Sequence, residues 1–84
     1  MSAEKCPYLL DVRELDGPEK HPTIHRMFDD LEPGQALTIV NDHEPRPLYY
    51  ELQAERPERF DEENYRAYEA GDRVWVAVLP TRAA

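Results

Sequence analysis

Polar and charged side chains gather directly after an apolar run near the middle of the chain. Residues 37–40 read Leu-Thr-Ile-Val, and four polar residues follow without a break: Asn41, Asp42, His43 and Glu44. Arg46 comes next, between two prolines. An amide, two carboxylates, an imidazole and a guanidinium at this spacing can bind an anion, hold a metal ion or satisfy neighbouring backbone groups. These residues are the first candidates for a functional site.

Two further candidates come from an earlier part of the chain. Arg13 ends a segment of β-compatible residues at 8–13, and His21 stands directly before Pro22. Proline suits the first turn of a helix, so we expect His21 at or before a helix start. His21 and His25 are four positions apart, a spacing that lets two imidazoles share one helical face. A separate interpretation is a metal site that uses His21 and His43 with Asp42 or Glu44.

Hydrophobic periodicity and turn residues predict the elements that must position these groups. Apolar residues recur at helical spacing after Pro22 until Pro33-Gly34, and again over residues 47–55. Strands are expected at 8–13 and 35–41, the second with apolar residues on both faces. Residues 64–80 are typical of two strands around a turn at 70–72. The predicted order is β-α-β-α-β-β.

This order predicts an α+β fold, a two-layer α/β sandwich with a four-stranded mixed sheet. Right-handed crossovers place both helices on one face of the sheet. We expect a single domain over residues 6–80, with frayed termini at 1–5 and 81–84. The other sheet face stays open. Either the valines of residues 74–78 or the set of Trp75, Ala77 and Leu79 must face away from the helices, and such an apolar surface is typical of contact with a protein partner.

The candidate residues should meet at one edge of this sheet. In an open α/β sheet, ligands bind in the loops after the carboxyl ends of neighbouring parallel strands. We therefore predict a site made of these residues: Arg13, His21, Asn41, Asp42, His43 and Arg46. Three interpretations stay open, namely capping of backbone groups, recognition of a small anion or acidic partner, and metal binding. Tyr49 and Tyr50 are interpreted as core and helix-edge residues rather than ligand contacts.

The composition of the chain argues against some classes of partner. It has 84 residues and a formal charge of −8, which disfavours nucleic acid and anionic membrane surfaces. No apolar stretch approaches the ~20 residues that span a bilayer. Cys6 is the single cysteine, which is consistent with a reducing compartment. We expect a cytoplasmic monomer or small homo-oligomer without a cofactor.

The first half of the chain contains Leu10-Asp11, Leu15, Pro18-Glu19 and Pro33-Gly34. Their spacing resembles the motifs of the SirA/TusA family of small sulfur carriers. Those proteins begin L-D-x-x-G-L-x-C-P-x-P and reach a P-G-E turn after their first helix. Gly17 stands at the position of the sulfur-carrying cysteine. The resemblance implies the fold predicted above, and an alternative function as a sulfur-relay protein whose thiol is lost or relocated to Cys6.

A closer likeness covers nearly the whole chain. The motifs L-D-x-R, H-P and N-D-H-x-P-x-P-L-Y are similar to those of an uncharacterised family known only as a domain of unknown function. They correspond here to residues 10–13, 21–22 and 41–49. This resemblance implies an association with redox or nitrogen-oxide proteins. The sequence shows no activated serine, glycine-rich phosphate loop or strong metal spacing, so we expect a non-catalytic binding or regulatory module rather than an enzyme.

Overall fold

The computed structural model describes residues 9–83, so Cys6 and the expected frayed segment 1–5 lie outside the described part of the chain. The elements follow in this order: β1 (Leu9–Asp11), the short 3-10 helix η1 (Val12–Glu14), α1 (Gly17–Asp29), β2 (Ala36–Asn41), α2 (Arg46–Glu55), the 3-10 helix η2 (Glu62–Asn64), β3 (Arg66–Gly71) and β4 (Val74–Pro80). Apart from the two 3-10 turns, this is the predicted β-α-β-α-β-β order.

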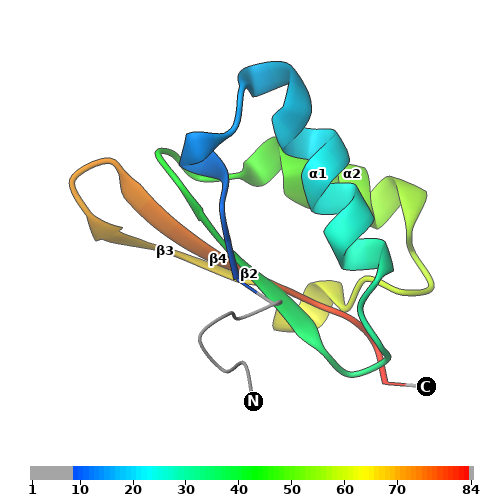
Figure 1. The fold of residues 1–84 in the computed structure, drawn as a ribbon. Coiled ribbons are helices and arrows are strands. Elements are labelled where there is room, and N and C mark those ends of the chain that lie inside the picture. Colours follow the sequence, from blue (N-terminus) through cyan, green and yellow to red (C-terminus); the bar gives the residue numbers. More distant parts are fainter. Residues whose placement is uncertain (1–8, 84) are drawn as a thin grey trace, which may run out of the picture.

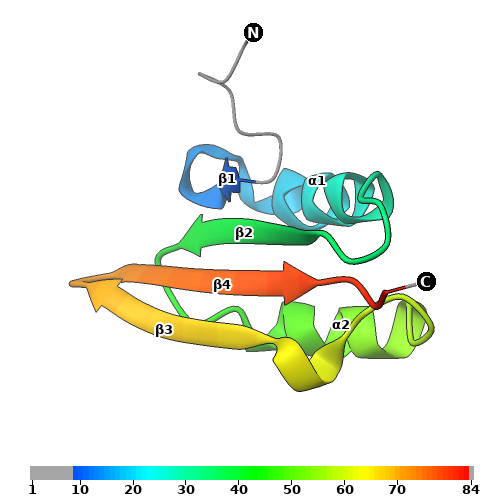
Figure 2. The same cartoon turned by 90° about the horizontal axis from the view of Figure 1, so that it is seen from below.

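The four strands form one mixed sheet with the order β1-β2-β4-β3. β1 runs parallel to β2, whereas β4 is antiparallel to both of its neighbours. Both helices cover the same face of the sheet (Figure 1), and the view from below shows the other face without a helix over it (Figure 2). The predicted two-layer α/β sandwich is confirmed, and β2 lies in the interior of the sheet as expected.

The hydrophobic core lies between the sheet and the two helices. Its buried residues come from every layer: Val12, Ile24, Phe28, Leu31, Leu37, Ile39, Leu48, Leu52, Phe60, Ala77 and Leu79. Successive strand residues point to opposite faces, which explains why β2 buries every second side chain from Leu37 to Asn41. The apolar stripe of α1, which includes Ile24 and Phe28, turns toward the sheet.

The burial of the β4 side chains shows that its valines, and not Trp75, Ala77 and Leu79, face away from the helices. Ala77 and Leu79 are buried in the core, so the open face carries Val76 and Val78 by alternation. Trp75 shares the alternation of Ala77 and pairs with the buried Asn41, so the tryptophan does not belong to the open face.

Two predicted boundaries near the first helix are wrong. β1 ends at Asp11 rather than residue 13, because the Asp11 side chain accepts a hydrogen bond from the Arg13 backbone N–H and starts η1. α1 begins at Gly17, five positions before Pro22. Pro18 occupies the first turn, where its missing N–H costs nothing, and Pro22 lies inside the helix.

The end of the chain is tied to the fold beyond residue 80, where we expected fraying. The Thr81 backbone N–H donates to the Gln35 carbonyl at 2.8 Å, and the Thr81 hydroxyl contacts the same oxygen at 2.6 Å. The Arg82 N–H donates to the Arg59 carbonyl at 2.7 Å. These bonds join the C-terminal segment to the loops that end the helices.

A helix that crosses a bilayer needs about 20 mostly apolar residues. None of the helices within residues 9–83 combines the length and the apolar character that crossing a membrane requires.

Candidate functional site

The loops after β1 and β2 meet at one edge of the sheet, as the topology predicted. Asp11 pairs with Val40 in the parallel ladder, so Arg13 and Asp42 each follow that pair by two residues. The charge of Asp42 contributes to a raised pKa of Arg13, after the larger effect of Asp11. The pKa of Asp42 is lowered mainly by its hydrogen bond with His43, and the charge of Lys20 in α1 lowers it further. Segments about thirty positions apart in sequence therefore lie side by side.

The charged groups at this edge are paired with their own neighbours. The Arg13 guanidinium makes two hydrogen bonds to the Asp11 carboxylate, at 2.8 and 2.7 Å, and holds the pKa of that carboxyl below its usual value. His43 Nδ1 lies 2.6 Å from Asp42 Oδ1, and this hydrogen bond lowers the pKa of Asp42. The buried Asn41 accepts the Asp42 backbone N–H at 2.9 Å. This arrangement is the one expected of loop capping.

His21 does not join this edge. Its Nδ1 lies 2.9 Å from Glu51 Oε2 of α2, and His25 Nε2 lies 3.0 Å from Glu51 Oε1. Because α1 begins at Gly17, His21 falls after the first turn of the helix and faces the neighbouring helix. His21 and His25 thus act together as a link between α1 and α2.

The same link continues toward the end of α2. Arg56 makes two hydrogen bonds to Asp29, at 2.5 and 2.7 Å, and its NH1 lies 3.1 Å from His25 Nδ1. The Asp29 contact raises the pKa of Arg56, and Arg56 lowers the pKa of Asp29. These contacts fasten the two helices to each other at the surface.

The two candidate metal ligands are bound to different carboxylates. His21 contacts Glu51, whereas His43 contacts Asp42. Across residues 9–83, no group of three or more His, Cys, Asp and Glu side chains is arranged to hold a metal ion.

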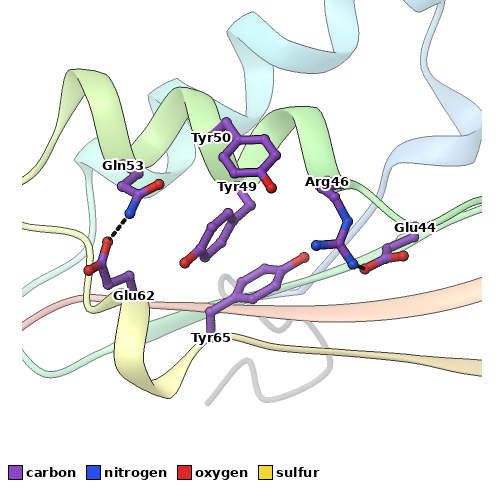
Figure 3. Close-up of a pocket in the computed structure, with 7 residues that line it drawn as sticks. All are labelled: Glu44, Arg46, Tyr49, Tyr50, Gln53, Glu62 and Tyr65. Atoms are coloured by element: carbon purple, nitrogen blue, oxygen red, sulfur yellow. Dashed lines mark hydrogen bonds and ion pairs between the residues drawn. The ribbon is translucent and has the colours of Figure 1, made fainter.

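A cavity of about 470 Å³ lies beside α2, next to the predicted edge. Seven residues line it: Glu44, Arg46, Tyr49, Tyr50, Gln53, Glu62 and Tyr65 (Figure 3). Arg46 is the one residue of the predicted site that lines this cavity. The volume falls within the range of about 300–1,000 Å³ that small-molecule sites usually have.

Three tyrosines form the aromatic part of the cavity. The ring of Tyr49 lies 4.7 Å from that of Tyr65 and 5.3 Å from that of Tyr50. Tyr49 also contacts the core residue Phe60, with 5.6 Å between ring centroids, while Tyr50 is exposed at the helix edge. The positions expected for Tyr49 and Tyr50 are therefore found, and both residues line the cavity as well.

Arg46 and two hydroxyl groups share one end of the cavity. The Arg46 guanidinium donates to Glu44 Oε2 at 2.5 Å, and the Tyr50 hydroxyl and the Glu44 charge raise the pKa of Arg46. The Tyr65 hydroxyl points toward Arg46 (Figure 3), and this oxygen is buried without a hydrogen-bond partner among residues 9–83. Burial raises the pKa of Tyr65, so its phenol stays protonated and able to donate.

The other end of the cavity is formed by an amide and a carboxylate. Gln53 Nε2 donates to Glu62 Oε1 at 2.5 Å, and this pair joins α2 to η2. A carboxylate has about four acceptor positions on its two oxygens. Glu62 can therefore accept further hydrogen bonds from a donor in the cavity.

The sequence analysis did not predict this cavity, although one signal could have indicated part of it. The lining residues Arg46, Tyr49, Tyr50 and Gln53 fall at i, i+3, i+4 and i+7, so they share one face of α2. Glu62 and Tyr65 have no such signal, because the chain brings them back to α2 only after the turn at residues 56–61.

Comparisons with known proteins identify a family without an assigned activity. The model of a family described as "Uncharacterized conserved protein (DUF2249)" matches residues 9–80. No curated protein and no solved structure matches the chain.

Proposed function

Because the chain belongs to the uncharacterized conserved protein family DUF2249, we propose a function from its own side chains. The protein is a non-catalytic binding or regulatory module that recognises an acidic group, either of a small molecule or of a partner. The site is the cavity beside α2, with Arg46 and the Tyr65 hydroxyl as the donors. The single observation that carries this function is the buried, unpartnered Tyr65 hydroxyl next to a guanidinium.

An unpartnered buried hydroxyl needs a physical reason. Leaving such a group without a hydrogen bond costs about 1–3 kcal/mol, and native proteins contain few of them, so each one needs an explanation. An acceptor atom bound beside Arg46 would take the hydrogen bond of Tyr65 and one of the five N–H donors of the guanidinium. Carboxylates and other oxyanions are the acceptors that fit such a pair of donors.

The edge with Arg13, Asp42 and His43 is the weaker candidate. Arg13 is already bound by both oxygens of Asp11, and His43 is bound by Asp42. An anion would have to compete with a carboxylate at either place, because Glu44 contacts Arg46 just as Asp11 contacts Arg13. The two places differ in a second donor. The cavity offers a donor that no residue of the described chain has taken.

A titration with benzoate tests this function. We expect chemical-shift changes at the Arg46 side chain and at the ring of Tyr65 in the isotope-labelled protein. Replacing Arg46 with glutamine should weaken binding at least about tenfold, since a charge-assisted hydrogen bond is lost.

Replacing Arg13 with glutamine is the matched control, because Arg13 is exposed and does not line the cavity. Arg13→Gln should leave benzoate binding unchanged. If it abolished binding while Arg46→Gln did not, the acidic group would bind at the sheet edge instead of the cavity.

A protein partner belongs to the same proposal, with the open sheet face as its contact surface. Val40, Val76 and Val78 are half-buried there, and Leu9 and Tyr68 are 49% and 54% exposed. An apolar partner surface would bury these side chains. The redox or nitrogen-oxide context implied by the resemblance remains part of this proposal.

The SirA/TusA likeness carries an alternative, a sulfur relay. It is supported by the element order and by the position of Gly17, which begins α1 and has room for a side chain, since an added Cβ meets no atom within 4 Å. Glycine holds no sulfur, and Cys6 lies outside the described residues. Mass spectrometry after treatment with a persulfide donor would decide: gain of one sulfur on Cys6 favours the relay, and an unchanged mass rejects it.

A further inference from the structure

The charges that line the cavity do not match a purely anionic occupant. Two carboxylates, Glu44 and Glu62, stand against one guanidinium, Arg46. The whole chain also carries a formal charge of −8. A ligand with only negative charge would be repelled by the second carboxylate and by the surrounding field.

The carboxylates occupy different places relative to Arg46. Glu44 contacts Arg46 directly at 2.5 Å, so its charge is largely compensated within that pair. Glu62 lies at the opposite end of the cavity, where its hydrogen-bonding partner is the neutral amide of Gln53 (Figure 3). The cavity therefore has a donor-rich end at Arg46 and an acceptor-rich end at Glu62.

The distance between the two ends suits a small molecule. Arg46 and Gln53 are seven residues apart on α2, which corresponds to about 10 Å along a helix axis. The rings of Tyr49, Tyr50 and Tyr65 line the space between the ends. Aromatic walls favour a flat or apolar linker, and their faces also attract a cationic group.

We infer that the occupant of this cavity is zwitterionic, an amino acid or a similar small molecule with a carboxylate and an ammonium group. The carboxylate binds at Arg46 and the Tyr65 hydroxyl, and the ammonium binds at Glu62. This inference rests on the proposed function, because it assigns the acidic group to the same donors. It adds the second charge of the ligand and the residue that recognises it.

Three related compounds test the inference by calorimetry or by chemical shifts. The first is 4-(aminomethyl)benzoate, which has both charges on a flat ring. The second and third are 4-methylbenzoate, which lacks the ammonium, and 4-methylbenzylamine, which lacks the carboxylate. With about 6 Å between its charges and hydrogen bonds of about 2.8 Å at each end, the first compound spans roughly 12 Å. We expect it to bind at least about tenfold more tightly than either of the other two.

Glutamine variants assign the ammonium end. Glu62→Gln should remove the preference for 4-(aminomethyl)benzoate over 4-methylbenzoate, because the charge is lost while the contact with Gln53 can persist. Glu63→Gln is the matched control, since Glu63 is exposed on the same turn and does not line the cavity. This control should keep the full preference. Circular dichroism confirms that both variants fold.

The outcomes separate this inference from the proposed function. Equal binding of 4-(aminomethyl)benzoate and 4-methylbenzoate would overturn the zwitterionic ligand and leave recognition of an acidic group intact. Absence of binding by both carboxylates would overturn the proposed function as well. Binding of 4-methylbenzylamine as tight as that of the zwitterion would show that the Arg46 end is not used, which contradicts both.

Discussion

Replacing Tyr65 with phenylalanine should stabilise the ligand-free protein, although in most buried tyrosines the hydroxyl makes a hydrogen bond that this substitution would remove. The Tyr65 hydroxyl is buried and has no hydrogen-bond partner among residues 9–83. Its ring packs against Tyr49 at 4.7 Å and Phe60 at 6.2 Å, and phenylalanine keeps both contacts. The substitution thus removes an unsatisfied group without creating a hole in the ring packing.

The size of the effect follows from the cost of that group. An unsatisfied buried hydroxyl costs about 1–3 kcal/mol, and Tyr65 is only half-buried as a whole residue. We therefore expect a gain near the lower limit, about 1 kcal/mol. For a domain of this size, such a gain raises Tm by roughly 4–8 °C. Thermal unfolding followed by circular dichroism, together with urea unfolding, measures it.

Tyr68→Phe provides the matched control for this experiment. Tyr68 is 54% exposed on the open sheet face, so its hydroxyl can reach water and the change should stay within about 0.5 kcal/mol. A loss of about 1 kcal/mol in Tyr65→Phe would refute the reasoning, because the hydroxyl would then be satisfied in the free protein. The same variant should bind benzoate more weakly, an opposition of stability and function that is common at binding sites.

Three further predictions concern the fold and its titrating groups. Asp29→Asn should lower the free energy of unfolding by about 0.5 kcal/mol at neutral pH, because Asp29 is 46% exposed in its pair with Arg56. Since the pKa of Asp29 is lowered in the folded protein, this stabilisation is present above the unfolded pKa and is lost as pH falls through the folded pKa. Urea unfolding at neutral and acid pH measures both effects. Leu52→Ala should cost about 2–5 kcal/mol because the side chain is fully buried, whereas Leu9→Ala, at a position 49% exposed, should cost far less in the same unfolding assay. Tyr65 should lose its proton above the usual pKa of about 10, because its pKa is raised in the folded protein. The stabilisation from its neutral phenol is therefore complete below about pH 10 and is lost as pH rises through the raised pKa. In an alkaline titration, phenolate absorbance should show a step at higher pH than the other tyrosines, and this step should be absent in Tyr65→Phe.

The order and type of the elements could be predicted from local patterns. Apolar residues at helical spacing, such as Ile24 and Phe28 in α1, and the continuous apolar run of β2 depend only on neighbours in the chain. The meeting of the loops after β1 and β2 also followed, since a right-handed parallel crossover leaves few alternatives. The start of α1 did not follow, because Pro18 and Pro22 are both compatible with a first helical turn.

The sequence by itself determined the two-layer architecture and placed Tyr49, Tyr50 and Gln53 on one expected helix, with Arg46 directly before it. Only the tertiary structure decided that Glu62 and Tyr65 complete the cavity and that His21 faces α2 instead of the sheet edge. Periodicity describes which residues of one element share a face. Which faces meet depends on how separate elements pack, and that packing is set by the core as a whole.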